Sequence, residues 1–397
     1  MVEVQPLGGF DQPLTYLTDI KTREKIQLGS LVQIPLGKRK VLGIVWSFEA
    51  KILKESTQIR KIIAVVHPSP VLTNDLMSLA TWISEYYSCP KESCLEAMIP
   101  SSIREGMKPK SRRLICLTDK SLNYDASLKR APAQTKVIAF LENEKKAVPV
   151  NQVLKETSTT SATIASLLTK GYIAETKEIV ERIAYEDQFI DSADQVHHSL
   201  ELTDEQKQSA TEISTDLHTR IFRTRLLSGV TGSGKTEVYF EAMQVALDQQ
   251  GSVLFLVPEV ALAPQTVSRL RTRFSSEKVV VWHSHLSSGE RVDAWRSLIK
   301  QESRIVVGAR SAIFAPLPKL RLIIVDEEHE SAYKQEDTPR YHARDVAVVR
   351  AKLTASTCIL GSATPSLETI NNVEKGKYAM SRLFKRVDNR ELPLIHL

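Results

Sequence analysis

The sequence has few cysteines and no pattern that would join them. Its 397 residues include four cysteines, at positions 89, 94, 116 and 358, with no C-x-x-C pair and no histidine at zinc-finger spacing. This distribution excludes a disulfide framework and provides no zinc site. The chain also lacks an apolar run of about 18 residues and a basic-then-apolar amino terminus, so we expect a cytoplasmic protein with no membrane partner.

Neither sign of charge dominates, and internal repeats and low-complexity tracts are absent. Lys and Arg number 53 against 47 Asp and Glu, which gives a net charge of +6, and 42% of the residues are hydrophobic. These values are typical of a soluble globular chain with two or three domains. The mild basic excess suits a polyanionic partner, and it fits a basic enzyme without one equally well.

What the sequence does contain is a phosphate-binding loop between Leu226 and Glu237. The spacing G-x-x-x-x-G-K-[ST] follows a short apolar run and precedes a segment of helical periodicity, which is the context this motif requires. In such a loop the N–H groups point inward, the lysine reaches the outer phosphates and the threonine hydroxyl ligates Mg²⁺. We therefore expect ATP and Mg²⁺ to bind at Gly229, Thr231, Gly232, Ser233, Gly234, Lys235 and Thr236.

A second group of functional side chains follows the apolar stretch Leu322 to Val325, where the sequence is Asp-Glu-Glu-His. Asp326 at a strand end can hold Mg²⁺ through its water shell, and Glu327 can orient and deprotonate a water that attacks the γ-phosphate. Lys235, Asp326 and Glu327 are thus the predicted catalytic residues. Strand and helix patterns alternate from Leu202 onward, which predicts a doubly wound α/β domain with a parallel sheet.

Residues 1–105 have a different pattern, which predicts a small β-barrel or sandwich with one helix, Asp75 to Tyr87. Two apolar strands, Leu28 to Pro35 and Val41 to Trp46, flank a basic turn. Lys38 and Arg39 in this turn are candidate DNA contacts, and the alternative is a solvated hairpin tip.

Residues 106–197 follow the pattern of a winged helix. A basic connector precedes three predicted helices, Ala133 to Glu144, Val150 to Lys155 and Ser161 to Lys170, and a strand pair begins at Gly171. The third helix has hydroxyls and one cation, so both groove binding and a purely architectural role remain open. The polar stretch Glu186 to Ser199 is the predicted linker to the α/β domain, residues 198–397.

The strand before Gly361 leads into Ser-Ala-Thr-Pro, and this segment together with the D-E-E-H sequence and the phosphate loop resembles the first motor lobe of superfamily 2 helicases. Longer segments resemble one branch of that superfamily, the bacterial replication-restart helicases. These segments are 257–266, 282–291, 307–316, 326–337 and 340–347. The resemblance covers the whole chain and implies, in order, a domain for DNA 3′ ends, a winged helix and an ATP-binding motor lobe.

The resemblance also implies roles for individual residues. Gln206 corresponds to the adenine contact, and Pro258, Glu259, Arg310 and Ser311 fall in motifs that line the path of single-stranded DNA. A loop that couples DNA to ATP in the family corresponds to Tyr333, Lys334, Arg340, Tyr341, His342 and Arg344. Aromatic and cationic side chains suit a flexible strand, whereas a core role for the two tyrosines is the alternative.

By this resemblance we expect an ATP-dependent 3′-to-5′ DNA helicase, associated with the nucleoid, that restarts replication at stalled or abandoned forks through primosome assembly. The implied partners are forked and single-stranded DNA, single-strand binding protein, and proteins of the primosome that load the replicative helicase. A different class of function, a fork-binding module that recruits partners without translocating, is the alternative.

Two departures from the family pattern limit what the resemblance implies. Thr15 stands where the family usually has an acid that contacts the terminal base, so recognition of a 3′ end is in doubt. The sequence ends at Leu397, before the family's zinc-binding cysteines, second motor lobe and carboxyl-terminal domain. Because such motors take transition-state arginines from the second lobe, we expect residues 1–397 alone to bind nucleotide with little or no hydrolysis and no unwinding.

Overall fold

The computed structural model describes residues 1–49, 59–67, 69–107, 111–119, 131–179, 201–258, 264–284 and 286–387. The chain forms two compact units, one made of residues 1–107 together with 184–397 and the other of residues 108–183. Among the described residues, no helix is both long enough and apolar enough to span a membrane.

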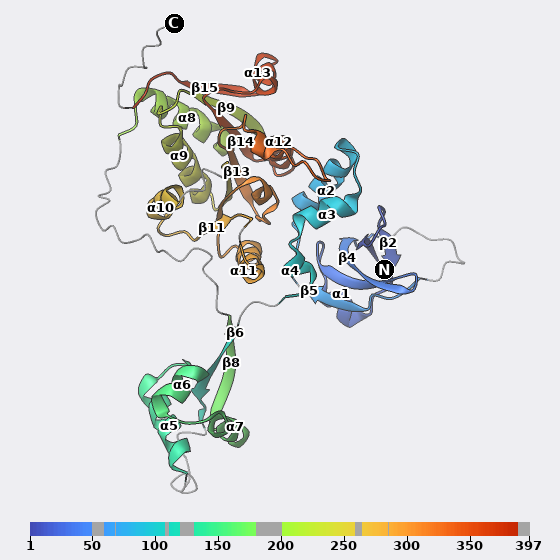
Figure 1. Cartoon of the computed structure of the whole chain (residues 1–397), viewed down its shortest axis with the longest axis vertical. Coiled ribbons are helices and arrows are strands. Elements are labelled where there is room, and N and C mark those ends of the chain that lie inside the picture. Colours follow the sequence, from blue (N-terminus) through green and yellow to red (C-terminus); the bar gives the residue numbers. More distant parts are fainter. Residues whose placement is uncertain are drawn as a thin grey trace. The chain divides into compact units, whose positions relative to one another are not determined.

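The first unit begins with an antiparallel five-stranded sheet of order β2-β1-β4-β3-β5 (Figure 1). Its inner face is made by alternate residues of the central strands, among them Val4, Val32 and Ile34, all fully buried. Asp19 caps the helix that follows β2 by accepting a hydrogen bond from Thr22. The elements are β1 (Val2–Leu7), β2 (Leu14–Tyr16), α1 (Ile20–Lys25), β3 (Leu31–Leu36), β4 (Arg39–Ser47) and β5 (Ala64–His67).

Three more helices follow the sheet, so this region contains four described helices where the sequence pattern predicts one. They are α2 (Asn74–Tyr86), α3 (Lys91–Met98) and α4 (Ser101–Arg104). The predicted helix is α2, and its apolar face is fully buried. The other helices of the region have only four to eight residues, too few for a helical period to stand out in the sequence.

The rest of the first unit is built on a seven-stranded sheet of order β11-β12-β10-β13-β14-β9-β15. Every neighbouring pair of strands is parallel, which confirms the predicted α/β fold. The sequence analysis did not identify the edge strand β15. The strands are β9 (Arg223–Gly229), β10 (Ser252–Leu256), β11 (Val279–Trp282), β12 (Ile305–Gly308), β13 (Leu320–Val325), β14 (Thr357–Ser362) and β15 (Ala379–Leu383).

Helices cover both faces of this sheet, and alternate strand residues belong to separate cores. On β10, Val253 and Phe255 pack with α8, α9 and α10, whereas Leu254 and Leu256 pack with α11, α12 and the 3₁₀ segment η4. The helical elements are α8 (Asp204–Thr219), α9 (Lys235–Asp248), α10 (Pro264–Arg273), α11 (Ser288–Ile299), η4 (Arg310–Phe314), η5 (Ser331–Tyr333), α12 (Ala343–Leu353) and α13 (Leu367–Glu374).

The amino-terminal helices share one core with the second of these faces, and polar contacts cross the same boundary. Arg350 on α12, fully buried, donates from Nε to Asp75 on α2 at 2.9 Å. Its other nitrogens donate to the carbonyls of Ile313 and Ala315, at and just after the end of η4, at 2.6 and 2.9 Å. Trp295 on α11 donates its indole N–H to the Val71 carbonyl at 3.0 Å. A single arginine thus joins three segments.

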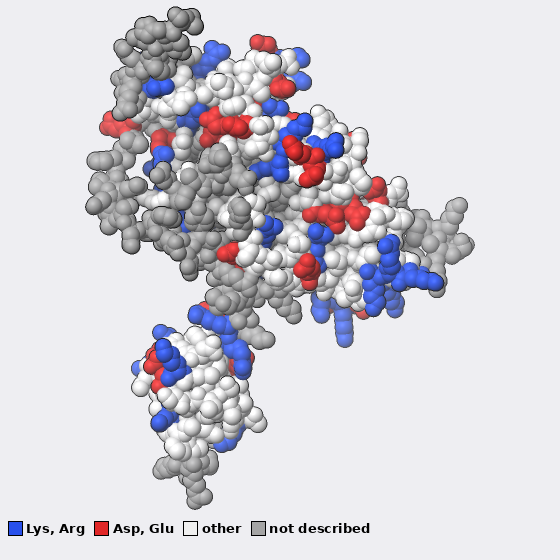
Figure 2. Space-filling model, in the orientation of Figure 1, with Lys and Arg blue, Asp and Glu red and all other residues white. Residues whose placement is uncertain are grey.

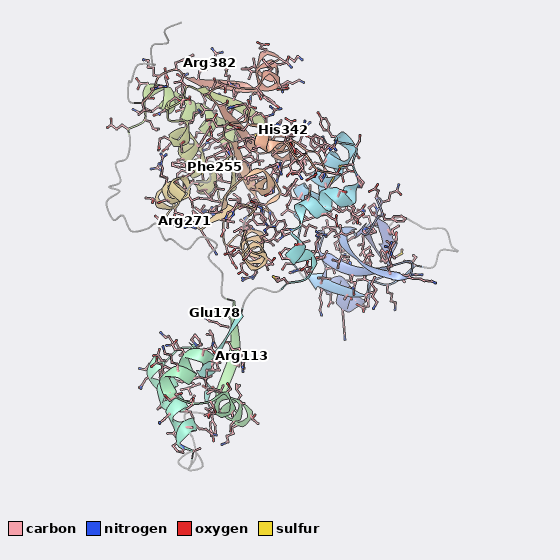
Figure 3. All side chains as sticks on the ribbon, in the orientation of Figure 1. Arg113, Glu178, Phe255, Arg271, His342 and Arg382 are labelled. Carbon is pink, nitrogen blue, oxygen red and sulfur yellow. The ribbon has the colours of Figure 1, made fainter. Side chains whose placement is uncertain are left out.

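The second unit contains the three predicted helices, α5 (Pro132–Glu144), α6 (Val150–Thr157) and α7 (Ser161–Lys170). Its antiparallel sheet has the order β7-β6-β8, with β6 (Ser111–Leu117), β7 (Val148–Pro149) and β8 (Ile173–Ile179). The strand that pairs with β8 is therefore β6, which precedes the helices and includes residues that the sequence analysis assigned to a connector. Arg113 pairs with Glu175 at 2.5 Å across these strands, and Arg112 pairs with Glu178 (Figure 3). The predicted linker Glu186 to Ser199 lies outside the described residues.

Candidate functional site

The phosphate loop joins β9 to α9, at the carboxyl end of the parallel sheet. Its conformation depends on glycine most clearly at Gly234, which has φ +77° and lies so close to Gln206 that a Cβ would be 2.3 Å from the amide nitrogen. Ser233 is buried, and its hydroxyl oxygen has no hydrogen-bond partner among the described residues. A buried hydroxyl without a partner in a phosphate loop is free to form a hydrogen bond with a phosphate ligand.

Lys235 is the first residue of α9, and its side chain extends toward the residues that follow β13. Its Nζ donates to the Gly229 carbonyl at 3.2 Å and lies 3.6 Å from Oε1 of Glu327. The lysine is 9% exposed, and the Glu327 side chain is 34% exposed. Two of the three predicted catalytic residues therefore form an ion pair in this structure.

Asp326, the third, is held by a tyrosine that the sequence analysis missed. The fully buried Tyr239 on α9 donates its hydroxyl to Asp326 Oδ1 at 2.9 Å. Gly361 on β14 makes room for this hydroxyl, because a Cβ there would lie 1.6 Å from it. Burial raises the pKa of Asp326 above its ordinary value, although the Tyr239 hydrogen bond and Lys235 act in the opposite direction. Burial likewise raises the pKa of Tyr239.

Glu327 has a left-handed backbone conformation, with φ +46°. This is uncommon for a residue with a side chain, and such strain occurs where the surroundings fix a functional geometry. Its Oε2 lies 3.7 Å from His329 Nδ1, and the same ring nitrogen is 2.8 Å from the hydroxyl of Ser362, the first residue of the Ser-Ala-Thr segment. The strained carboxylate thus lies between the phosphate loop and the end of β14.

Glu328 is fully buried. Its carboxylate accepts hydrogen bonds from the Ser366 N–H at 2.7 Å, the Thr369 hydroxyl at 3.0 Å and the Arg344 guanidinium at 3.2 Å. Arg344, the last residue of the predicted coupling loop, lies in the first turn of α12. Glu328 therefore links the strand end of the catalytic residues to the segment after Ser-Ala-Thr and to α12.

Gln206 lies beside the phosphate loop, as the family resemblance implies, but its amide already has partners on both atoms. Its Oε1 accepts from the Thr203 N–H at 2.8 Å in a capping box, and its Nε2 donates to the Ser233 carbonyl at 2.9 Å. The residue is 2% exposed. In this conformation its amide fastens α8 to the loop.

The predicted DNA contacts of the motor domain divide into an exposed group and a buried group. Lys334 and Arg340 are exposed, and Arg310 is partly buried with Nη1 donating to the Lys334 carbonyl at 2.6 Å. Tyr333 and Tyr341 are only 1% and 3% exposed, so the stacking role predicted for them does not fit this conformation.

The physical reason is that each buried tyrosine serves the core. The Tyr333 hydroxyl donates to the Asp326 carbonyl at 2.7 Å, and the Tyr341 ring packs against Phe314. Burial raises the pKa of Tyr341 to about 12 even though Arg310 is hydrogen-bonded to it. Of the other residues assigned to the single-strand path, Glu259 lies outside the described residues.

The amino-terminal domain also has exposed basic side chains among the predicted DNA contacts. Lys38 and Arg39 are exposed at the turn between β3 and β4, and the Arg60 guanidinium donates to the Gly37 carbonyl in the same turn. Figure 2 shows lysine and arginine side chains gathered on one side of this domain. Thr15 is on the edge strand β2, which is separated from this hairpin by β1, and lies opposite Glu3 of β1.

No group of three or more His, Cys, Asp or Glu side chains is placed to hold a metal ion in the part of the chain that the structure describes. The oxygens predicted to ligate Mg²⁺ are the Thr236 hydroxyl, on the residue after Lys235, and the Asp326 carboxylate. Such a pair suits Mg²⁺, which keeps several waters and takes further ligands from nucleotide phosphates.

Comparison with known proteins agrees with this geometry. Residues 1–100 match the 3′DNA-binding domain (3′BD) of PriA, and residues 203–373 match the DEAD/DEAH box helicase domain. The replication restart protein PriA of Bacillus subtilis is 34% identical over 98% of this chain and 56% of its own length. That of Chlamydia muridarum is 37% identical over 97% of this chain and 51% of its own length.

The chain thus spans about half the length of these relatives. The two matched domains occupy the regions where the structure has the amino-terminal β domain and the parallel sheet with its phosphate loop. The chain is therefore similar to the replication restart proteins PriA, and it has one region that matches the 3′DNA-binding domain and another that matches the DEAD/DEAH box helicase domain.

Proposed function

We propose that the chain serves an ATP-dependent DNA helicase that moves 3′ to 5′ and acts at stalled or abandoned replication forks, where it restarts replication through primosome assembly. The observation that supports this most directly is the Lys235–Glu327 pair, 3.6 Å apart, beside the partly buried Asp326. This arrangement suits hydrolysis of a nucleoside triphosphate. The matched 3′DNA-binding domain makes DNA the substrate on which that energy is used.

In this mechanism, inward-facing N–H groups of the loop and the Lys235 ammonium bind the phosphates. Glu327 orients the attacking water and accepts its proton, and its left-handed backbone keeps the carboxylate directed at the site. Tyr239 fixes the orientation of Asp326. When bound to Thr236 and Asp326, Mg²⁺ supplies neutralising charge on the outer phosphates.

Coupling to DNA runs through Glu328 in this proposal. Single-stranded DNA contacts Arg310, Lys334 and Arg340, and the loop that contains the last two ends at His342, which caps α12. Arg344 then transmits a displacement of this loop to Glu328 through their ion pair. Because Glu328 follows Glu327 directly, the catalytic carboxylate responds to occupancy of the DNA path.

The proposed partners are forked and single-stranded DNA, single-strand binding protein, and primosome proteins that load the replicative helicase. A nucleoid location in the cytoplasm follows from these partners. The exposed basic turn at Lys38 and Arg39 is the proposed contact of the amino-terminal domain with DNA phosphates.

The test is substitution of the loop lysine. Lys235→Ala should abolish binding of ATP, measured by calorimetry with Mg²⁺ present, while affinity for forked DNA stays within about twofold. The exposed Lys300→Ala in the same domain is the matched control, since it removes an equal charge away from the loop. Loss of DNA affinity equal to the loss of ATP affinity would mean that the loop supports the fold and not the chemistry.

A second candidate function, a fork-binding module that recruits partners without translocating, is favoured by the exposed basic turn, which lies far along the chain from the ATP site. Its signature is an affinity for forked DNA that falls steeply with salt and does not respond to nucleotide. Addition of ATP decides between the two candidates, because a helicase changes its DNA affinity with nucleotide and the module does not.

A further inference from the structure

The four residues after β15 lie along the phosphate loop, although no motif of the sequence points to them. Val230 donates its N–H to the Leu383 carbonyl at 3.2 Å, and Val387 donates its N–H to the Gly232 carbonyl at 3.1 Å. Arg382 on β15, labelled in Figure 3, lies two residues before this segment, which we define as residues 384–387. The segment thus follows the loop from its first residues to its middle.

The first turn of helix α8 binds the first two residues of the same segment. The Glu205 carboxylate in the first turn of α8 accepts hydrogen bonds from the N–H groups of Phe384 at 2.8 Å and Lys385 at 3.2 Å. The next residue, Gln206, is bonded to the Ser233 carbonyl of the loop. The start of α8, the loop and residues 384–387 therefore form one hydrogen-bonded wall.

The order of the strands shows which end of a nucleotide faces this wall. The loop follows β9, which lies between β14 and β15 in the sheet, and the catalytic carboxylates follow β13 on the β14 side. The outer phosphate must lie toward those carboxylates and Lys235. The opposite side of the loop, next to β15, is then the side on which the nucleoside extends away from the phosphates.

Arg386 is placed on that nucleoside side. Its Cγ lies 3.9 Å from the position that a Cβ would take at Gly232, so the side chain passes over the loop. Its Nε is buried and has no hydrogen-bond partner among the described residues. A buried N–H donor without a hydrogen-bond partner lowers the stability of the protein. This cost is removed when a bound ligand supplies the acceptor.

We propose that Arg386 contacts the nucleoside end of the bound nucleotide, with its planar guanidinium against the base. The inference rests on the proposed ATP site and adds a residue that determines affinity for the nucleoside. A guanidinium suits this position because it is flat, stacks on aromatic faces and is weakly hydrated compared with an ammonium.

The experiment compares two ligands that share the triphosphate and differ in the nucleoside. Binding of ATP and of inorganic tripolyphosphate is measured by calorimetry for the full chain and for Arg386→Ala, Arg386→Lys and Lys385→Ala. We expect Arg386→Ala to weaken ATP binding about tenfold and to leave tripolyphosphate within about twofold. Arg386→Lys should weaken ATP binding nearly as much, because it keeps the charge and loses the flat group.

Lys385→Ala is the matched control, since this exposed lysine joins the wall only through its backbone, and it should change neither affinity. Equal weakening of both ligands in Arg386→Ala, with recovery in Arg386→Lys, would place the contact on the phosphates and overturn the proposal. Unchanged ATP affinity in both Arg386 variants would overturn it as well. If the wild-type chain binds ATP and tripolyphosphate equally, the nucleoside adds no affinity and the Arg386 proposal fails while the phosphate site stands. If the wild-type chain binds neither ligand, the proposed ATP site itself fails, so the two failures are distinguished.

Discussion

The buried arginine between the amino-terminal helices and the motor domain provides the sharpest test of the packing. Substitution Arg350→Met keeps most of the side-chain volume and removes the guanidinium. The Asp75 carboxylate, whose side chain is 11% exposed, then loses its ion-pair partner, and the carbonyls of Ile313 and Ala315 lose their donors. Removal of one member of a buried pair costs about 3–5 kcal/mol, because the other charge stays buried.

A surface pair in the same unit supplies the comparison. Arg104 and Glu96 are also 2.9 Å apart, but their side chains are 28% and 46% exposed. Arg104→Met should therefore lower the free energy of unfolding by only about 0.2–1 kcal/mol. The two ion pairs have the same N–O distance and differ in burial and in the two carbonyl hydrogen bonds that Arg350 also donates.

The measurement is urea unfolding of the full chain, followed by tryptophan fluorescence, because Trp82 on α2 and Trp295 on α11 report on the two sides of the boundary. For Arg350→Met we expect the urea midpoint of the fluorescence transition to fall by about 1 M or more. An Arg350→Met midpoint equal to that of Arg104→Met would refute the reasoning and show that the apolar core alone holds the domains together.

Two further predictions concern the Asp326 carboxylate and the Tyr239 hydroxyl that donates to it. Gly361→Ala should lower the free energy of unfolding by about 1–3 kcal/mol and displace Tyr239, because the new Cβ would lie 1.6 Å from the Tyr239 hydroxyl oxygen. In thermal unfolding, the double variant Gly361→Ala/Tyr239→Phe should recover part of this loss. A Gly361→Ala protein as stable as the wild type would contradict the geometry. Burial raises the folded-state pKa of Asp326 above its unfolded value, so the native state binds more protons between those two pKa values, and its contribution to stability is lost as pH rises through that window. Asp326→Asn should therefore raise the unfolding free energy at pH 7 and flatten its acid-side pH dependence in denaturant titrations, and an unchanged pH profile would show that the carboxyl is not penalised by burial.

Local patterns in the sequence were sufficient to predict the elements whose stabilising contacts are short in range. The phosphate loop, the strand before Asp326 and the helices of the second unit depend on residues a few positions apart, and they lie where the periodicity and the glycines indicate. Strand β6 was different, because Arg112 and Arg113 look like a connector until β8 pairs with them some 60 residues later. Strand β15 likewise depends on β9, which is distant in sequence.

The same distinction holds within the site. Tyr239 was missed because an apolar helix position gives no sign of the aspartate that its hydroxyl meets on another strand. Arg386 was missed because its neighbour Gly232 is about 150 residues away in the chain. Tyr333 and Tyr341 have the composition of a stacking loop, and only the packing against Asp326 and Phe314 shows that they are buried. Roles that depend on tertiary neighbours cannot be obtained from residue type and spacing.

The three consecutive carboxylates after β13 have a mechanical consequence. Asp326 is held by Tyr239 and Glu327 by Lys235, both on α9, whereas Glu328 is fixed to α12 through Arg344. Successive Cα atoms are only about 3.8 Å apart, so a displacement of Glu328 acts directly on the backbone of Glu327. In the proposed mechanism, a small rotation of α12 would change the direction of the Glu327 carboxylate directly, without a long relay of side chains.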